Sequence, residues 1–241
     1  MSKQEESKKI PNEGPTVALK LPGISLSLSG ASAVIVLATL LVLIVVFVVY
    51  LVRANLESML WVSGGLWILF IIYWSAAAKN AAPTSSSESI ASRQLHQLLM
   101  YGALALALFR VPGLGQRWLP IAPYIVPIGL ALHVISALLA IWARQHLGRN
   151  WSGAITAKVD HQLIRTGPYR LVRHPIYSGM LGMFLGTAFV SGELHGLLAV
   201  VIIAVAYWRK IRLEEQHLRN VFGFAYDEYR QKSWALIPGL Y

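Results

Sequence analysis

The sequence predicts an all-α integral membrane protein with five to six transmembrane helices and a helical hairpin near its C-terminus. Three observations favour this class. Of the 241 residues, 56% are hydrophobic and only 13% are charged, whereas soluble domains average about 45–50% and about 25%. Residues 31–52 form a charge-free apolar stretch, long enough for a bilayer-spanning helix. The chain has no cysteine, which excludes a disulfide scaffold, a cysteine-ligated metal site and a thiol nucleophile.

The apolar stretches divide the chain into predicted elements. Residues 1–28 are rich in charge, Pro, Gly and Ser, and we expect them to form a mobile tail ahead of the transmembrane region at 29–143. Predicted membrane helices occupy 31–52, 59–78 and 121–143, and three shorter candidates lie at 95–109, 175–190 and 196–208. The number of crossings is five or six, depending on whether 95–109 spans the bilayer. A tight turn over 191–195 joins the last two segments into the hairpin.

The basic residues fall on one side of the predicted membrane. If all six segments cross, the loops on one side hold 18 of the 21 Lys and Arg residues, and the loops on the other side hold only Arg53, Arg110 and Arg117. Cytoplasmic loops carry such an excess. We therefore expect a multi-pass protein with both termini and the 144–174 loop in the cytoplasm. The net charge of +10 then faces anionic membrane lipids and requires no nucleic-acid partner.

The loop before the hairpin is dense in groups that bind charged ligands. Its last residues include Arg173 and His174, and Pro175 fits the first turn of the following helix, where its missing N–H is not needed. The free N–H groups of such a helix start favour an anionic group, for example a carboxylate. The alternative is that Arg173 and His174 only anchor the helix end among lipid headgroups.

A continuous helix is predicted to leave the membrane after the hairpin. It carries Lys210 and Glu214 as an i, i+4 pair on one face, either as a solvated salt bridge or as part of a polar site at the membrane boundary. The aromatic tail at 222–229 either packs back over the polar loop as a lid or lies on lipid.

Searches for metal and nucleotide motifs find none: the sequence contains no HExxH, no pair of histidines at helical spacing, no P-loop and no GxGxxG. No metal site is predicted. His133 is a polar residue in the otherwise apolar predicted helix 121–143, with either a functional role or a packing role. Close helix packing accounts for the glycines on one face of the hairpin, Gly179, Gly182 and Gly186.

Taken together, residues 144–241 resemble the isoprenylcysteine carboxyl methyltransferase family of integral membrane enzymes. The resemblance rests on an ordered set of motifs: the segment His161-Gln162-Leu163-Ile164, the turn Gly167-Pro168-Tyr169, the run Arg173-His174-Pro175-Ile176-Tyr177-Ser178-Gly179, a hairpin, the doublet Glu214-Glu215 and the tail Phe222-Gly223…Tyr226…Tyr229. The related phospholipid N-methyltransferases share the RHPxYxG and Glu-Glu elements, so the motifs identify the cofactor better than the acceptor.

The resemblance implies that 144–241 is a catalytic region with a cytoplasmic pocket for S-adenosyl-L-methionine (SAM), which donates a methyl group to a lipid-like or prenylated acceptor from the membrane. Catalytic roles fall to Arg173 and Glu214. Cofactor-binding roles fall to His161, Gln162, Leu163, Ile164, Tyr169, His174, Pro175, Ile176, Tyr177 and Glu214. Arg209 and Lys210 would bind the acceptor. Lys210 stands where carboxylate-methylating members have an arginine; lysine keeps the charge but loses the bidentate fork.

Three functions remain open at this point. A carboxylate acceptor is already anionic and needs no general base, whereas a phospholipid amine would first have to lose a proton. The third possibility is a non-catalytic membrane protein that binds the ligand. The oligomeric state is open. Both enzymatic functions require that Tyr177 and Glu214 lie close enough to touch one small molecule.

Overall fold

The computed structural model describes residues 17–21, 24–28, 56–78, 85–86, 88–152, 156–157 and 162–239, in two separate units, 1–51 and 52–241. The first unit contains the antiparallel pair β1 (Val17–Leu21) and β2 (Ile24–Leu28). The predicted span at 31–52 lies outside the described residues, so the number of crossings stays a prediction.

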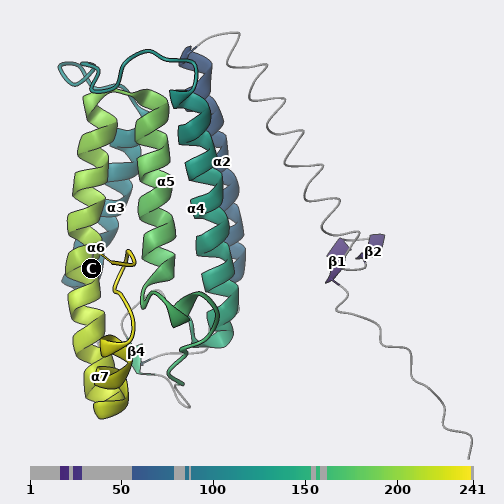
Figure 1. Cartoon of the computed structure of the whole chain (residues 1–241), viewed down its shortest axis with the longest axis vertical. Coiled ribbons are helices and arrows are strands. Elements are labelled where there is room, and N and C mark those ends of the chain that lie inside the picture. Colours follow the sequence, from purple (N-terminus) through teal and green to yellow (C-terminus); the bar gives the residue numbers. More distant parts are fainter. Residues whose placement is uncertain are drawn as a thin grey trace, which may run out of the picture. The chain divides into compact units, whose positions relative to one another are not determined.

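The second unit is a helical bundle (Figure 1). Its α-helices are α2 (Leu56–Ala78), α3 (Ile90–Leu108), α4 (Ile125–Leu147), α5 (Pro175–Ser191), α6 (Leu194–Phe222) and α7 (Phe224–Gln231). Short elements connect them: the 3₁₀ turns η1 (Gly148–Asn150) and η2 (Gly167–Arg170), and the strand pair β3 (Ser85–Ser86) with β4 (Thr156–Ala157). The predicted segments from 59 onward are therefore confirmed as helices.

Three of these helices are long and apolar enough to cross a bilayer: α2 from Met59, α4 and α6. Helix α5 is apolar but shorter. Many apolar side chains on the outer faces of the bundle are exposed, among them Ile68, Leu69, Ile72, Ile135, Leu138 and Val201. Exposed apolar side chains in this number suit contact with lipid.

Glycines bring α4 and α5 into close contact, as the sequence predicts. A Cβ atom on Gly186 would lie 2.6 Å from the carbonyl oxygen of Gly129, and one on Gly179 would lie 2.6 Å from the carbonyl oxygen of Ser136. Beside this contact, His133 lies fully buried, with Nδ1 3.3 Å from both Ser63 Oγ and Thr187 Oγ1. These contacts give His133 a packing role between α2, α4 and α5.

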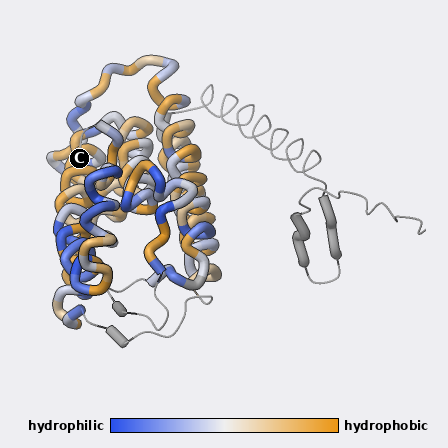
Figure 2. Tube along the Cα trace, turned by 60° about the horizontal axis from the view of Figure 1, so that its bottom comes forward, coloured by the Kyte–Doolittle hydropathy of each residue, from blue (hydrophilic) through white to orange (hydrophobic). Residues whose placement is uncertain are grey.

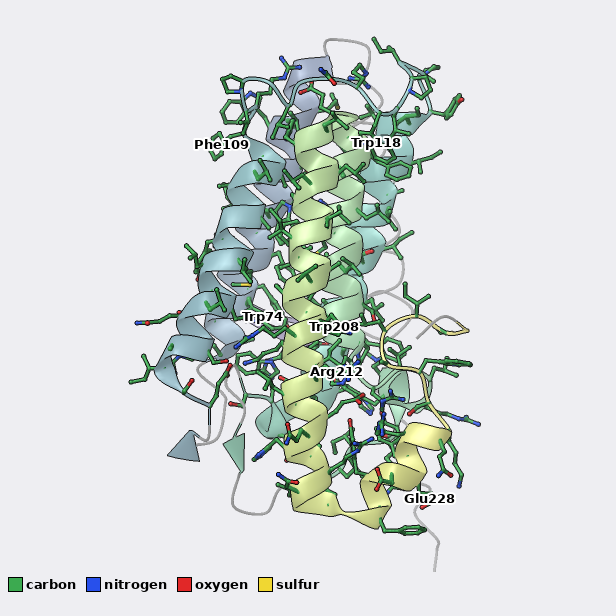
Figure 3. All side chains as sticks on the ribbon, turned by 90° about the vertical axis from the view of Figure 1, so that its left-hand side faces the viewer. Trp74, Phe109, Trp118, Trp208, Arg212 and Glu228 are labelled. Carbon is green, nitrogen blue, oxygen red and sulfur yellow. The ribbon has the colours of Figure 1, made fainter. Side chains whose placement is uncertain are left out.

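The predicted turn between α5 and α6 is confirmed. Gly192 has φ = 62° and ends α5 in the left-handed conformation, which glycine adopts without steric cost. Arg117 donates to the carbonyl of Ser191 at 3.2 Å, and Arg110 lies 3.0 Å from Glu193. These contacts tie the α3–α4 loop, in which Trp118 is labelled in Figure 3, to the hairpin turn.

The opposite end of the bundle, where α3 and α5 begin and α4 and α6 end, is here called the polar end. Helix α6 has 29 residues, or about 44 Å at about 1.5 Å per residue. A bilayer core is about 30 Å thick, so the C-terminal part of α6 extends beyond it. Hydrophilic residues gather at this end, which Figure 2 turns toward the viewer.

Candidate active site

The start of α5 is held by the C-terminal segment of the chain. Pro175 occupies the first turn of the helix and His174 is its N-cap, as the sequence predicts. The backbone N–H of Arg173 donates to the carbonyl of Trp234 at 2.8 Å, and that of His174 donates to Ala235 at 3.0 Å. Residues about 60 positions later in the chain therefore fix the backbone that presents the RHPxY run.

The polar side chains of α5 and α6 converge at this point. The Tyr177 hydroxyl donates to Glu214 Oε1 at 2.7 Å, and His174 Nδ1 lies 3.5 Å from Glu214 Oε2. His174 Nε2 lies 3.5 Å from Glu215 Oε1 as an ion-pair contact, and this buried nitrogen makes no hydrogen bond among the described residues. The convergence that the sequence required is confirmed, and it leaves one buried donor available to a ligand.

The electrostatics of this cluster favour a charged imidazole. Burial lowers the pKa of His174, but its close contacts with Glu214 and Glu215 and their negative charge outweigh burial and raise the pKa above its ordinary value. When protonated, His174 carries positive charge between two carboxylates. The site can therefore bind a ligand that carries both charges.

Four aromatic rings form a continuous row along the inner side of the site. The rings of His174 and Tyr177 stack with centroids 5.7 Å apart, and Tyr177 stacks on Tyr207 at 4.8 Å. Tyr207 in turn lies 5.9 Å from His96 of α3. This row offers flat, polarisable walls of the kind that pack against a purine base.

Several predicted cofactor residues lie in one apolar cluster next to the row. Tyr169 and Ile176 are buried together with Ala143, and Ile164 and Tyr177 pack against them. Pro175 is buried at the same helix start. Burial and the charge of Glu214 raise the pKa of Tyr169 well above its ordinary value, so its hydroxyl stays neutral.

Two further predicted cofactor residues are less buried than this cluster. The side chain of Gln162 is exposed and that of Leu163 is half-buried. His161 lies outside the described residues.

Glu215, which is not among the predicted site residues, is the central carboxylate of an ion-pair cluster. Its carboxylate binds Arg173 Nε at 2.8 Å and Arg230 Nε at 3.1 Å. Arg173 also donates through Nη1 to the backbone carbonyls of Arg230 and Ser233. Because Arg173 joins α6 to the C-terminal segment, the geometry favours a positioning role for it. In the sequence, the doublet Glu214-Glu215 is the pattern that indicates this second acidic residue of the site.

The aromatic tail packs back over the polar loop, which was one of its two predicted positions. The Tyr229 hydroxyl donates to the carbonyl of Tyr169 at 2.5 Å, and Arg165 lies 3.6 Å from Glu228. Glu228 is labelled at this end of the molecule in Figure 3. Burial raises the pKa of Tyr229 to about 12, so its hydroxyl remains a donor at neutral pH. The tail covers the loop that carries the predicted cofactor residues.

The two predicted acceptor-binding residues have partners from the segment before α3. Lys210 does not pair with Glu214 in the expected i, i+4 bridge: its Nζ lies 2.5 Å from Glu88 Oε2 instead, and both side chains are 2% exposed. Arg209 donates to Ser92 Oγ at 2.8 Å, and Ser92 donates to Glu88 Oε1 at 2.9 Å. Nothing in the sequence pattern points to Glu88, an isolated acid in a serine-rich linker.

A cavity of about 430 Å³ opens beside this network. It is lined by Glu88, Ser89, Ser92, Arg209, Leu213, Gln216, His217 and Asn220. Lys210 is not among the lining residues, whereas its partner Glu88 is.

The fold and the site define an integral membrane protein with a polar, ligand-sized site at one end of a helical bundle. The family described as phospholipid methyltransferase matches residues 124–225. Protein-S-isoprenylcysteine O-methyltransferase B of Arabidopsis thaliana is 32% identical over 133 residues, which are 53% of this chain and 64% of that protein. Probable protein-S-isoprenylcysteine O-methyltransferase of Oryza sativa subsp. indica is 33% identical over 133 residues, 53% of this chain and 65% of that protein.

A solved structure, the eukaryotic intramembrane Ras methyltransferase ICMT (isoprenylcysteine carboxyl methyltransferase), is similar with 23% identity and a TM-score of 0.46, over 62% of this chain and 50% of that chain. The chain spans just under two thirds of the length of the curated relatives named above. The family resemblance predicted from the motifs is confirmed for the C-terminal half of the chain.

Proposed function

We propose that the chain is an integral membrane methyltransferase that transfers a methyl group from SAM to a carboxylate of an isoprenylcysteine-type, lipid-like acceptor. The observation that carries the proposal is the contact of Tyr177 and His174 with Glu214 at the polar end. The printed names of the curated relatives support the reaction and the acceptor class. The basic residues around the polar end favour the cytoplasmic membrane face for it.

The residues present fit SAM, which carries an ammonium, a carboxylate, an adenine and the sulfonium that supplies the methyl group. Glu214 would accept hydrogen bonds from the ammonium, and the buried Nε2 of His174 would donate to the carboxylate. Tyr169, Pro175, Ile176 and Tyr177 would line the apolar part of the site. From the motif, His161, Gln162, Leu163 and Ile164 would complete it.

The chain's contribution to the reaction is alignment and charge. Holding two reactants in line can lower a barrier by about 7–11 kcal/mol, and a site shielded from water strengthens each electrostatic contact. Lys210 and Arg209 would hold the acceptor carboxylate, which needs no general base. Arg173, predicted to be catalytic, would act by holding Glu215 and the covering tail in place.

The direct test is SAM binding to the detergent-solubilised protein, measured by calorimetry. A hydrogen bond to a charged group contributes about 1.5–3 kcal/mol, and about 1.4 kcal/mol is tenfold in affinity. We therefore expect Glu214→Gln to weaken SAM binding by roughly tenfold or more. The matched control is Glu228→Gln, a partly exposed acid on α7, which should bind like the parent. Equal affinity for SAM in parent and Glu214→Gln would remove Glu214 from the site.

A second candidate is a methyltransferase of phospholipid amines, because the matching family is described as phospholipid methyltransferase. The two reactions leave different products. Membranes supplied with SAM labelled in its methyl group should yield a base-labile methyl ester if a carboxylate is the acceptor. A base-stable product in the phospholipid fraction would favour the amine instead, and SAM binding without any transfer would favour a ligand-binding protein.

A further inference from the structure

Lys210 is the buried cation nearest in sequence to Glu214 and lies one helical turn before it. Its ammonium group already binds a carboxylate of the same chain. Glu88 Oε2 lies 2.5 Å from Lys210 Nζ, and both side chains are 2% exposed. At this distance and burial the pair is a charge-assisted contact that solvent screens weakly. The surroundings of the Lys210 ammonium therefore accommodate a carboxylate, and in this structure that carboxylate is the side chain of Glu88.

Glu88 contacts both the cavity and this cation. It lines the cavity together with Ser92 and Arg209, whereas Lys210 does not line it. A carboxylate that enters the cavity therefore meets Arg209 before it can reach Lys210. To reach Lys210 it must displace the Glu88 carboxylate from Nζ, because two carboxylates in one buried site repel each other.

Glu88 lies at the start of α3, and its carboxylate binds Lys210 through Oε2 and Ser92 through Oε1. Glu88 directly precedes the N-cap Ser89 of α3, and its Oε1 accepts a hydrogen bond from Ser92 at 2.9 Å. Ser92 also accepts from Arg209 at 2.8 Å. A displaced Glu88 could thus leave Lys210 while Arg209 and Ser92 stay in place to receive the incoming group.

We propose that Glu88 is a specificity-determining residue: an internal carboxylate that occupies Lys210 and competes with the acceptor's carboxylate for it. The proposal rests on the proposed function, because it takes Lys210 as the acceptor-binding cation. It predicts that this competition sets the affinity for the acceptor, and that it weakens binding only of ligands whose anionic group goes to Lys210. The affinity for SAM, which would bind on the Tyr177 side of Glu214, is not affected.

The test measures binding of a defined probe, N-acetyl-S-farnesylcysteine, to the detergent-solubilised full chain, with its uncharged carboxamide as the matched ligand. Glu88→Gln removes the competing charge and keeps the size of the side chain. We expect it to tighten binding of the carboxylate probe by roughly tenfold, since removing a buried like charge relieves repulsion, and to leave binding of the carboxamide unchanged. Where methyl transfer is measured, KM for the acceptor falls and KM for SAM does not change.

Two further variants separate competition from a general structural effect. Glu88→Asp keeps the charge but shortens the side chain that reaches Lys210 Nζ, so it should tighten binding of the carboxylate by a smaller factor than Glu88→Gln. Glu193→Gln makes the same substitution at a buried, ion-paired glutamate just before the other end of α6, whose partner Arg110 is half-exposed, and should change neither affinity.

Several outcomes would overturn the proposal: unchanged or weaker carboxylate binding in Glu88→Gln, equal tightening for the carboxamide, or loss of methyl transfer with binding intact. The last result would make Glu88 a participant in the reaction, as an amine acceptor would require. Failure of the proposed function is seen separately, as absence of SAM binding or of transfer in the parent, while the probe-binding comparison still decides the role of Glu88.

Discussion

The hydroxyl of Tyr177 donates a hydrogen bond to Glu214 across 2.7 Å, although the two residues are 37 positions apart. Tyr177 lies in the first turn of α5 and Glu214 in the C-terminal part of α6, and the two helices are joined by the turn at Gly192 at the opposite end of the bundle. An antiparallel hairpin brings the start of its first helix beside the end of its second. The RHPxY run and the Glu-Glu doublet therefore form one site because of this pairing.

Tyr177→Phe tests the contribution of that hydrogen bond. The substitution removes the donor but keeps the ring that stacks on His174 and Tyr207. We expect a loss of about 0.5–1.5 kcal/mol in stability, or more because the acceptor is charged, and several-fold weaker SAM binding because Glu214 is less well oriented. Calorimetry and thermal unfolding measure the two effects. Tyr101→Phe, at an exposed tyrosine of α3, serves as control, and an equal effect there would refute the assignment.

The raised pKa of His174 predicts how stability depends on pH. A group whose folded-state pKa is raised stabilises the folded protein fully below its unfolded-state pKa, ordinarily 6.5. That contribution is lost as the pH rises through the folded-state value. The unfolding temperature in detergent should therefore fall as the pH increases above 6.5. His174→Gln should flatten this fall.

Glu214→Gln and Glu215→Gln should also reduce the slope, because each removes a charge that raises the pKa of His174. If all three variants keep the slope of the parent, the dependence arises elsewhere in the chain.

Gly186→Val tests the close contact of α4 and α5. The added Cβ would lie 2.6 Å from the carbonyl oxygen of Gly129, so the helices must separate. We expect a loss of about 1–3 kcal/mol or more, measured as a lower unfolding temperature. Gly102→Ala on α3 adds a Cβ with nothing within 4 Å and should stabilise by about 0.5–1 kcal/mol. Similar behaviour of the two variants would contradict close packing as the reason for the glycines.

Arg173→Lys distinguishes positioning from catalysis. Lysine cannot bind Glu215 and the carbonyls of Arg230 and Ser233 at once, because it lacks the guanidinium fork. The tail should then detach more often, and trypsin should cleave after Arg230 and Lys232 several times faster than in the parent. Arg170→Lys, at an exposed neighbour, is the control. A lower kcat with unchanged tail cleavage would instead assign Arg173 to the reaction.

The sequence by itself determined the features that depend on local composition and spacing. Apolar stretches of sufficient length predicted α2 and α4, Pro175 predicted the start of α5, and Gly192 predicted the turn before α6. These features follow from short-range rules, because a buried helix needs apolar residues and a left-handed turn favours glycine. The ordered motifs likewise predicted that His174, Tyr177 and Glu214 act together.

Only the tertiary structure decided which charges pair. Local spacing favours Lys210 with Glu214, yet Lys210 binds Glu88 and Glu214 binds Tyr177 and His174. A pair at i, i+4 is worth only a few tenths of a kcal/mol, whereas a buried charge without a partner costs several. The partners of buried charges are therefore set by which segments pack together, and that arrangement is a property of the folded chain as a whole.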